Sequence, residues 1–551
     1  MSSAGAHRGA MLAPNVPPPE DYYQSNCRLV CTEILSRQAH LLTGRERTEL
    51  QQFLACPQPA QRLFARILTR KGPWLRRDTL CYSEVGDTTV ACNTLAAAGL
   101  VTLTPSAPAD RLLGLLTKAE LTDLAVSLRV LTPARGRALR KAALITELLS
   151  GRSDLQLNDV LRRRFTWLAL TDRALWDNVR VWYFGDAMQD WSTFVIRDLG
   201  MVAYESVPLT DPQFADRQAF ERDAHYRRLS SLSHRLDEHT GLAGALSAAL
   251  AMPAGDRWTE RRRERALLRL ARWQERHGHD EAALQAYSRV ACHPARERTA
   301  RILTRLGREE EAQRVLSGIR AAPWHDEERQ FAERFGQRRR RSQPPTLTLE
   351  IPAVDTALRI EQQALLALAR TRAVAWGAHC ENTLVRTLTG LRYWSALFHP
   401  VRGAFTRPFQ SVPNDLHFED FARQRSSLLE EIEAGTQDSR QLAEHLLATA
   451  AAKAGLANGL VSWALLDRIP LSVLLETMPA EHIHRLTAYQ IRNLHQRRTG
   501  FPDLLVAYAD GAYELLEVKG PNDQLQPGQR VWFARLAELG LPARVLKLRV
   551  H

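Results

Sequence analysis

The chain has 551 residues, more than one hydrophobic core usually holds together, so several domains are expected. Its 74 Lys and Arg outnumber its 61 Asp and Glu, which gives a formal net charge of +13 at pH 7. The hydrophobic fraction of 45% is ordinary for a globular protein. The positive charge favours a polyanionic partner, either nucleic acid or an anionic membrane surface. Lysine is rare, so a compositional bias toward arginine is the alternative explanation of the charge.

The seven cysteines form no regular framework, and we expect reduced, buried thiols rather than disulfides. Cys27 and Cys31 lack a second pair at zinc-finger spacing, which leaves a metal site there as the weaker alternative. No apolar run approaches the roughly 18 residues of a membrane span, and the amino terminus lacks a signal-peptide core. Without a P-loop, no nucleotide cofactor is indicated. These features predict a cytoplasmic protein with no membrane partner.

Residues 1–20 are small and proline-rich, and we expect them to be disordered. Residues 21–105 begin with helical patterns and continue with strand-like runs at 88–90 and 100–103, which predicts a winged-helix-like, DNA-binding region. Three basic residues beside Trp74 would suit a phosphate backbone: Lys71, Arg76 and Arg77. A solvated turn explains them equally well.

Residues 106–160 hold two helical patterns, and Thr117 with Glu120 predicts a capping box at the start of the first. These patterns resemble the SAP helix-loop-helix fold, which binds DNA. Four basic residues cluster where that fold meets phosphates: Arg135, Arg137, Arg140 and Lys141. Such contacts position a protein on DNA without reading its bases. An ordinary helical hairpin is the alternative.

Residues 161–341 are predicted to be helical and contain a weak repeat, in which Gly278 and Gly307 each precede an alanine-containing helix. The repeat resembles a tetratricopeptide-type helical pair, and we expect a helical connector. Its basic runs, 261–263 and 338–341, either line a DNA path or form a solvated face. Residues 342–345 break the helical pattern as a linker.

The carboxy-terminal part, 346–551, contains the most informative pattern of the chain. The run 504–508 predicts a strand, 509–511 a turn and 513–519 a second strand. Side chains alternate along a strand, so Glu517 and Lys519 point to the same side, where Asp503 can meet them at the sheet end. Two carboxylates and an ammonium there suit binding of a hard divalent ion and water activation, the chemistry of phosphodiester hydrolysis.

This pattern resembles the PD-(D/E)xK nuclease superfamily, and the string from Glu517 to Asp523, with Gln529 and Trp532, resembles its VRR-NUC domain. A helix with Pro527 at its start and Gly540 past its end, then a strand at 543–550, should complete the sheet. Trp532 is expected to pack in the core.

A helix that begins near Glu381 would supply another acid. Glu381, Trp394–Phe398, Phe409–Gln410, Pro413–Leu416 and Arg425 are similar to the Fanconi-anaemia-associated nuclease family. The resemblance implies a mainly helical, multidomain protein with SAP-like and tetratricopeptide-like regions before an α/β nuclease domain. It also implies a metal-dependent endonuclease with 5′-to-3′ exonuclease activity on 5′-flap and branched DNA, acting in interstrand crosslink repair. The missing amino-terminal extension argues for a bacterial form, nucleoid-associated when acting.

Carried onto this chain, the resemblance implies that Mg²⁺ or Mn²⁺ is the cofactor. The implied metal ligands are Glu381, Asp503, Glu517 and the carbonyl of Val518, with Lys519 activating water and Gln410 supporting the site. Further candidates for indirect or phosphate contacts are Asp523, Gln529, His495 and Arg498. Gln524 stands where animal relatives have an arginine, which argues against the phosphate contact expected at that position. A non-catalytic DNA-junction scaffold and a helical-repeat interaction adaptor remain the alternative functions.

Overall fold

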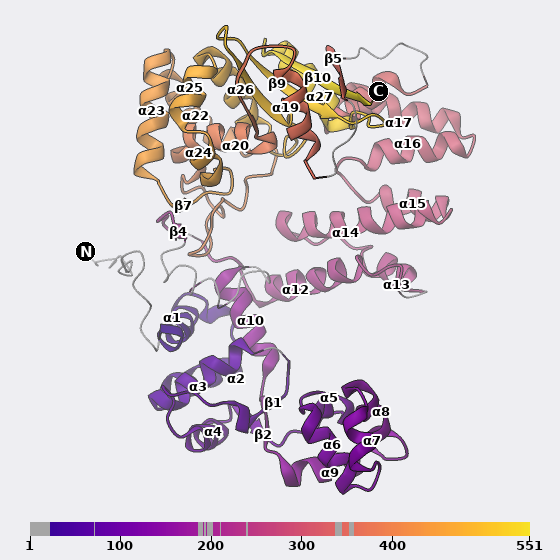
Figure 1. The fold of residues 1–551 in the computed structure, drawn as a ribbon, viewed down its shortest axis with the longest axis vertical. Coiled ribbons are helices and arrows are strands. Elements are labelled where there is room, and N and C mark those ends of the chain that lie inside the picture. The colour runs from indigo at the N-terminus through magenta and orange to yellow at the C-terminus, as the bar shows by residue number, and fades with distance from the viewer. Residues whose placement is uncertain are drawn as a thin grey trace. The chain divides into compact units, whose positions relative to one another are not determined.

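The computed structural model describes residues 22–70, 72–185, 191, 194, 202–209, 211–238, 241–336, 344–351 and 357–550. These form two compact units, residues 1–203 and 204–551 (Figure 1). The tail 1–20, Lys71 and the basic run 338–341 lie outside the described residues. Within the described ranges, no helix combines the length and apolar character that crossing a membrane requires.

The first unit is built mainly from helices. They are α1 (Tyr22–Arg37), α2 (Gly44–Ala55), α3 (Gln58–Thr69), α4 (Thr88–Ala97), α5 (Ala109–Gly114), α6 (Lys118–Ser127), α7 (Pro133–Ala138), α8 (Lys141–Leu149), α9 (Asp154–Arg164) and α10 (Arg173–Phe184). Its strands are β1 (Leu75–Arg76), β2 (Val101–Leu103) and β3 (Trp167–Leu170), and short 3₁₀ turns lie at Ala39–Leu41 and Arg77–Thr79.

The three strands form one sheet, and the strand-like run at 88–90 is not part of it. The order is β1-β3-β2, so β2 pairs antiparallel with β3, far along the chain. Residues 88–90 begin helix α4 instead, because the side chain of Asp87 accepts hydrogen bonds from the backbone of Thr89 and Val90 and caps the helix. The sequence pattern at 100–103 is confirmed as a strand.

The first unit also extends past the expected boundary at residue 160. Strand β3 supplies the partner of both β1 and β2, and α10 contacts α1. Trp176 of α10 packs edge-on against Phe53 and Phe64, and its indole donates to Glu49 at 2.9 Å. Residues 161–184 therefore belong to the amino-terminal unit and not to the helical repeat.

Helices α5 to α9 form the SAP-like region around one core cluster. The capping box is confirmed: Thr117 accepts from the backbone of Glu120, and the Glu120 carboxylate accepts from the backbone of Thr117 at 2.7 Å. Gly136 of α7 lies so close to α6 that an added Cβ would fall 2.7 Å from the Thr122 methyl group. A small residue is required there, because α6 and α7 pack closely.

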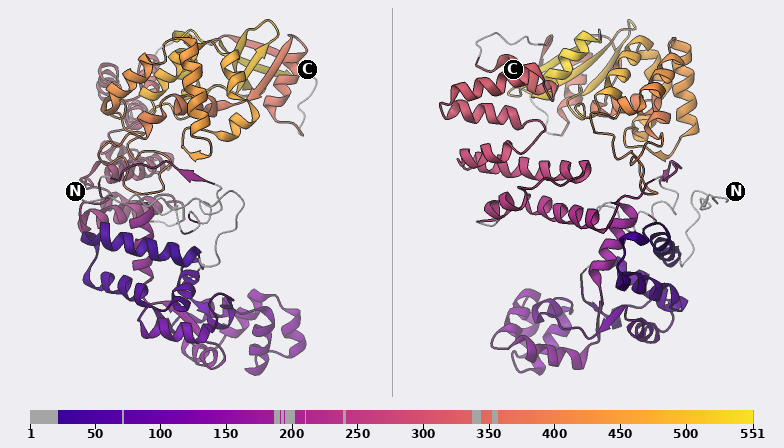
Figure 2. Two further views of the ribbon diagram at one scale, coloured as in Figure 1. Left: turned by 90° about the vertical axis from the view of Figure 1, so that its left-hand side faces the viewer. Right: turned by 180° about the vertical axis from the view of Figure 1, so that it is seen from behind.

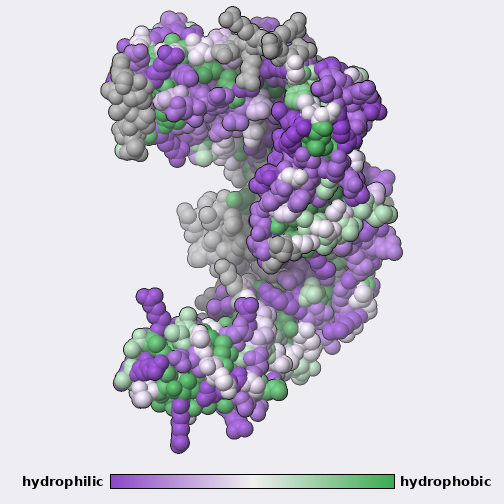
Figure 3. Space-filling model, turned by 90° about the vertical axis from the view of Figure 1, so that its right-hand side faces the viewer, coloured by the Kyte–Doolittle hydropathy of each residue, from purple (hydrophilic) through white to green (hydrophobic). Residues whose placement is uncertain are grey.

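The second unit starts with helical pairs. They are α12 (Arg217–Leu232), α13 (Leu242–Ala249), α14 (Arg257–Arg276), α15 (Asp280–Tyr287), α16 (Ala295–Arg305), α17 (Glu309–Ala321) and α18 (Asp326–Arg334), after β4 (Ala203–Tyr204). The expected repeat is present: Gly278 and Gly307, at φ +77° and +74°, turn the chain from α14 into α15 and from α16 into α17. Figure 3 shows a mostly hydrophilic surface over this side of the molecule.

The nuclease-like part follows. Its helices are α19 (Ile360–Ala369), α20 (Glu381–Arg392), α21 (Trp394–Leu397), α22 (Ser426–Ala434), α23 (Ser439–Ala452), α24 (Trp463–Arg468), α25 (Leu471–Thr477), α26 (Ala480–Arg492) and α27 (Pro527–Glu538). Its strands are β5 (Thr346–Ile351), β6 (Val374–His379), β7 (Leu456–Ala457), β8 (Leu504–Tyr508), β9 (Tyr513–Lys519) and β10 (Ala543–Val550), with a 3₁₀ turn at Arg423–Arg425. The strands and the helix predicted over 504–550 are confirmed.

One five-stranded sheet, in the order β5-β10-β9-β8-β6, organises this part (Figures 1 and 2). Strand β10 runs parallel to β5 and β9, whereas β8 is antiparallel to β9 and β6. Because side chains alternate, β8 and β9 bury one set of residues against α19 and the other against the larger helical core. Leu504 and Leu516 face α19, while Leu505, Leu515 and Trp532 belong to the larger core.

Candidate metal centre and nucleic-acid interface

The ends of β8 and β9 bring together the predicted acidic pair and lysine. The Oδ2 atom of Asp503 accepts the backbone N–H of Val518 at 2.9 Å, so the carboxylate is held against β9. Lys519 Nζ lies 2.9 Å from Glu517 Oε1, which confirms that both side chains leave β9 on the same side. Glu517 is 1% exposed, and its second oxygen, Oε2, has no hydrogen-bond partner among the described residues.

This arrangement makes the charged forms of both carboxylates costly. Burial and the neighbouring Asp503 raise the pKa of Glu517 to about 8, against the opposing effect of Lys519. Burial also raises the pKa of Asp503, as do Glu361 and Glu381. A buried carboxylate oxygen without a donor is costly unless a cation faces it. The oxygen donor set of Asp503 and Glu517 therefore fits a hard divalent ion.

Glu381 opens α20 beside this pair. The backbone N–H groups of Cys380 and Glu381 both donate to the carbonyl of Asp503, at 2.9 and 3.0 Å, which joins the start of α20 to the start of β8. Glu381 has φ +38°, in the left-handed region that a non-glycine residue rarely occupies. Its side chain is exposed and accepts from Asn382 at 2.8 Å. The structure thus places Glu381 next to Asp503 on a strained backbone.

Gln529 contacts the site directly. From the first turn of α27 its Nε2 donates to Glu517 Oε1 at 2.5 Å. Its own Oε1 accepts the backbone N–H of Gln526 at 2.8 Å, so the amide cannot turn freely. Asp523, by contrast, closes the turn after β9 by accepting from Gly520 at 3.1 Å.

Gln410, which the resemblance assigns to the site, has its side-chain amide engaged within a loop, and its role in the site stays a prediction. Its Oε1 accepts from the backbone of Thr406 and Arg407, and its Nε2 donates to carbonyl groups within the same loop and to Asn414. The side chain is 4% exposed and holds the 404–414 loop, because its amide donors and acceptors are used there. In the described structure it makes no hydrogen bond to an acidic residue of the site.

Arg76, a predicted DNA contact, has a buried side chain. The side chain is 7% exposed, pairs with Asp78 and with Glu120 at 2.6 Å, and lies over the Phe165 ring. These partners occupy its guanidinium, which joins the capping box of α6 to β1, and its contact with DNA stays a prediction. Arg77 is half-buried. The other predicted phosphate contacts of this unit are exposed: Arg135, Arg137, Arg140 and Lys141.

A cluster of arginines in the second unit was largely missed. Arg261 and Arg265 lie one turn apart on α14, Arg386 belongs to α20, and Arg498 precedes Asp503. Burial, Arg265 and Arg498 lower the pKa of Arg261 to about 10. Burial, Arg265 and Arg386 likewise lower the pKa of Arg498. Arginines that lower one another's pKa lie close together, and such a group of positive charges attracts an anion.

The same cluster surrounds His417. Burial, Arg498 and Arg261 lower the pKa of His417 to about 3, which keeps its imidazole neutral. Arg261 donates to the His417 carbonyl at 2.6 Å and lies over the Phe418 ring. Of this cluster, the sequence pointed only to Arg498 and to the basic run at 261–263. Arg263 of that run is buried and paired with Glu260.

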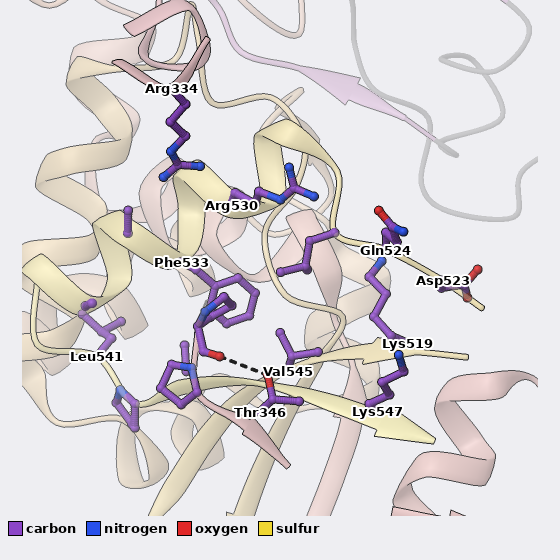
Figure 4. Close-up of a pocket in the computed structure, with 17 residues that line it drawn as sticks. Arg334, Thr346, Lys519, Asp523, Gln524, Arg530, Phe533, Leu541, Val545 and Lys547 are labelled. Carbon is purple, nitrogen blue, oxygen red and sulfur yellow. Dashed lines mark hydrogen bonds between the residues drawn. The ribbon is translucent and has the colours of Figure 1, made fainter. Parts of the chain in front are cut away.

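A pocket of about 750 Å³ opens beside Lys519 (Figure 4). Lys519 and Lys547 lie side by side there, since they are register partners on β9 and β10. Arg334 and Arg530 line the pocket from α18 and α27. Its basic lining makes it a second place where a phosphate would be favoured.

Among the residues that the structure describes, two groups have the residue types and spacing of metal ligands. Asp503 belongs to one of them, with Glu361 and His379, neither of which the sequence singled out. The other contains His293, His325 and Glu327. There the imidazole rings stack at 4.4 Å with planes 14° apart, so their in-plane lone pairs do not converge on one ion. His325 Nδ1 also already accepts from the backbone of Glu327 at 3.2 Å.

Two family models match the chain. The model described as "FAN1, HTH domain" matches residues 21–102, and the "VRR-NUC domain" matches residues 438–549. A Fanconi-associated nuclease 1 homolog of Pseudomonas aeruginosa is 33% identical over 98% of this chain and 97% of its own length. The Arabidopsis thaliana homolog is 27% identical over 97% of this chain and 67% of its own.

Solved structures agree with these relatives. The crystal structure of paFAN1 bound to 2-nucleotide 5′-flap DNA with a gap has a TM-score of 0.85 and 30% identity. It covers 98% of this chain and all of that one (100%). A complex of paFAN1 with a 1-nucleotide 5′ flap has a TM-score of 0.80 and 28% identity.

Proposed function

Because the chain belongs to the Fanconi-associated nuclease 1 family, we propose that it is a metal-dependent, structure-specific DNA endonuclease acting on 5′-flap and branched DNA. The flap DNA in the two crystal structures supports this substrate class. We also propose exonuclease activity in the 5′-to-3′ direction. The proposed cellular role is interstrand crosslink repair, in association with a bacterial nucleoid. The observation that carries it is the cluster of Asp503, Lys519 and the buried Glu517, one of whose carboxylate oxygens has no hydrogen-bond partner among the described residues.

Different residues would bind the metal ion, activate the attacking water and orient the metal ligands. Asp503, Glu517, Glu381 and the carbonyl of Val518 would hold Mg²⁺ or Mn²⁺. When bound, such an ion supplies positive charge against the scissile phosphate and acidifies bound water. Lys519 can donate a hydrogen bond to the attacking water or to a phosphate oxygen from its position 2.9 Å from Glu517. Gln529 keeps the Glu517 carboxylate oriented.

Basic residues would hold the nucleic acid. Two arginines of the cluster are close in sequence to site residues: Arg386 follows Glu381 on α20, and Arg498 precedes Asp503. Arg261 and Arg265 of α14 complete the cluster. In the first unit, the exposed face of Arg135, Arg137, Arg140 and Lys141 would contact the sugar–phosphate backbone, which positions DNA without reading sequence. Arg77 stays a weaker candidate for the same role.

The test is cleavage of a 5′-labelled flap duplex by purified protein with Mg²⁺, Mn²⁺ or chelator, with the cut position mapped on a sequencing gel. Wild-type protein should cut near the junction with either metal and leave the substrate intact with chelator. Lys519→Ala should bind the flap and not cut it, whereas Lys453→Ala, a lysine paired with Glu205 and distant in sequence, should cut normally. Undiminished cutting by Lys519→Ala would overturn the assigned role, and binding without metal-dependent cutting by wild type would favour the scaffold alternative.

A further inference from the structure

One face of helix α14 carries arginines along most of its length. Residues three or four apart in an α-helix lie on the same face. Helix α14 has arginine at five positions with this spacing, which we call the arginine row: Arg261, Arg265, Arg269, Arg272 and Arg276. At a rise of about 1.5 Å per residue, the first and the last are about 22 Å apart along the helix axis.

The row begins in the cluster of Arg261, Arg265, Arg386 and Arg498. Burial, Arg265 and Arg498 lower the pKa of Arg261. In the next turn of α14, burial and Arg265 lower the pKa of Arg269. Each of the first three arginines of the row therefore lies close to the next one, and the positive charge continues from the cluster into the helical repeat.

The far half of the row lines a pocket of about 720 Å³. The pocket lies between the residues that follow α12, the second half of α14 and helix α16, which belong to successive layers of the repeat (Figure 1). Its lining from α14 and α16 is rich in arginine: Arg269, Arg272, Trp273, Arg276, Arg298 and Arg305. This pocket is separate from the one beside Lys519.

The two acidic residues of the pocket already have partners. Glu275 pairs with Arg298 and accepts from the Tyr287 hydroxyl at 3.0 Å. Asp237 accepts the indole N–H of Trp273 at 2.6 Å. These carboxylates are therefore used within the repeat, and they leave the remaining positive charge of the pocket uncompensated.

Two arginines of the pocket lack a partner. Arg272 and Arg276 are exposed, and neither makes a hydrogen bond or an ion pair with any residue that the structure describes. Guanidinium groups bind phosphate through paired hydrogen bonds. The ring centroids of Trp273 and His277 lie 4.2 Å apart in a stacked arrangement, and DNA bases stack on such rings in proteins that bind single strands. This end of α14 thus offers both phosphate and base contacts.

We propose that the arginine row holds the single-stranded part of a long 5′ flap and leads it from the arginine cluster to the pocket at the far end of α14. This inference rests on the proposed function and extends it to the part of the substrate that lies away from the cut. Single-stranded DNA is favoured over an acidic peptide, because the row is continuous with the cluster that would hold DNA phosphates. Contacts to phosphates and base faces predict no sequence preference.

The test compares the binding of two flap duplexes to the full-length protein, measured by fluorescence anisotropy with chelator so that no DNA is cut. One duplex has a flap of one or two thymidines, and the other has a flap of about 12 thymidines. Wild type should bind the long flap more tightly than the short one. Arg272→Ala with Arg276→Ala should bind the short flap as wild type does and the long flap about 10-fold more weakly than wild type, because two charged contacts are lost.

The dependence on salt gives a second readout. For the long flap, the slope of log K against log salt should fall by about 1.4 in the double variant, since each phosphate contact to a single strand contributes about 0.7. The matched control is Arg289→Ala with Arg314→Ala, which removes the same charge from exposed positions of the repeat outside α14. It should bind both flaps as wild type does. Unchanged binding of the short flap also shows that the double variant is folded.

The outcomes separate this inference from the proposed function. Equal affinity of wild type and the double variant for the long flap would overturn the inference, as would equal weakening by the control variant. Tighter binding of an oligoglutamate peptide than of oligothymidine, lost in the double variant, would assign the pocket to an acidic protein partner and overturn it too. Each of these results leaves metal-dependent cutting of the short flap, and with it the nuclease proposal, standing. Wild type that neither binds nor cuts either flap would remove both.

Discussion

The side-chain amide of Gln529 donates to Glu517 Oε1 at 2.5 Å, and Lys519 Nζ reaches the same oxygen at 2.9 Å. One oxygen of Glu517 is thus occupied by two donors, while the other has no hydrogen-bond partner in the described structure. This division orients the unpartnered oxygen and explains how α27, which begins at Pro527, contributes to a site formed by strand ends.

Gln529→Ala should therefore weaken metal activation. We expect the Mg²⁺ concentration needed for half-maximal cleavage to rise about 10- to 100-fold, as is usual when a group that orients a metal ligand is removed. The measurement is a Mg²⁺ titration of flap cleavage. Gln524→Ala, in the preceding loop, serves as the control and should leave the titration unchanged. Equal titration curves for Gln529→Ala and wild type would contradict the orienting role.

Loss of a single arginine from the cluster near the site should affect DNA binding and not stability. Arg498 makes no hydrogen bond or ion pair within the described ranges, and its pKa is lowered by burial and by neighbouring arginines. Arg498→Ala should bind flap DNA more weakly and reduce the slope of log K against log salt by about 1. Arg440→Ala, an exposed residue paired with Glu444 on α23, is the matched control. An unchanged salt slope for Arg498→Ala would exclude a phosphate contact.

Arg76→Ala should behave in the opposite way. Its guanidinium is buried between Asp78 and Glu120, so removing it leaves carboxylates without their partner. We expect a loss of about 2 kcal/mol in the free energy of unfolding, below the value for fully buried pairs because Asp78 is half exposed. Urea denaturation measures this loss. Arg137→Ala, exposed on the SAP-like region, should keep its stability and lower DNA affinity.

The stabilisation of the protein by metal should grow with pH. The pKa of Glu517 is raised from 4.5 to about 8 in the metal-free protein. Between these values the folded state keeps a proton that the unfolded chain has released, so the free energy of unfolding falls as pH rises through this window. Metal requires the ionised carboxylates. The increase in Tm caused by Mg²⁺ should therefore be larger at pH 8 than at pH 6, and Glu517→Gln should abolish the difference.

Strands β8, β9 and β10 of the carboxy-terminal sheet were predictable because their signals are local. Alternation and turn residues predicted the strands at 504–508, 513–519 and 543–550, and the proline at 527 predicted the start of α27. The Asp503, Glu517 and Lys519 cluster followed from strand geometry alone. The capping box at Thr117 was equally local.

The remaining features depend on contacts between distant segments. The pairing of β2 with β3 places residue 101 opposite residue 170, and no local sequence pattern predicts this pairing. The burial of Arg76 depends on Glu120 and Phe165, which are distant in sequence, so its local sequence does not distinguish it from a surface arginine. Glu361 and His379 reach Asp503 through α19 and β6, elements whose packing on the sheet is visible only in the folded chain.

Anomalous diffraction from crystals soaked in Mn²⁺ tests the metal centre most directly. The wild-type protein should show a peak between the carboxylates of Asp503 and Glu517, and crystals of Asp503→Asn should lose it. A well-ordered wild-type sheet with no anomalous peak among those oxygens would contradict the account.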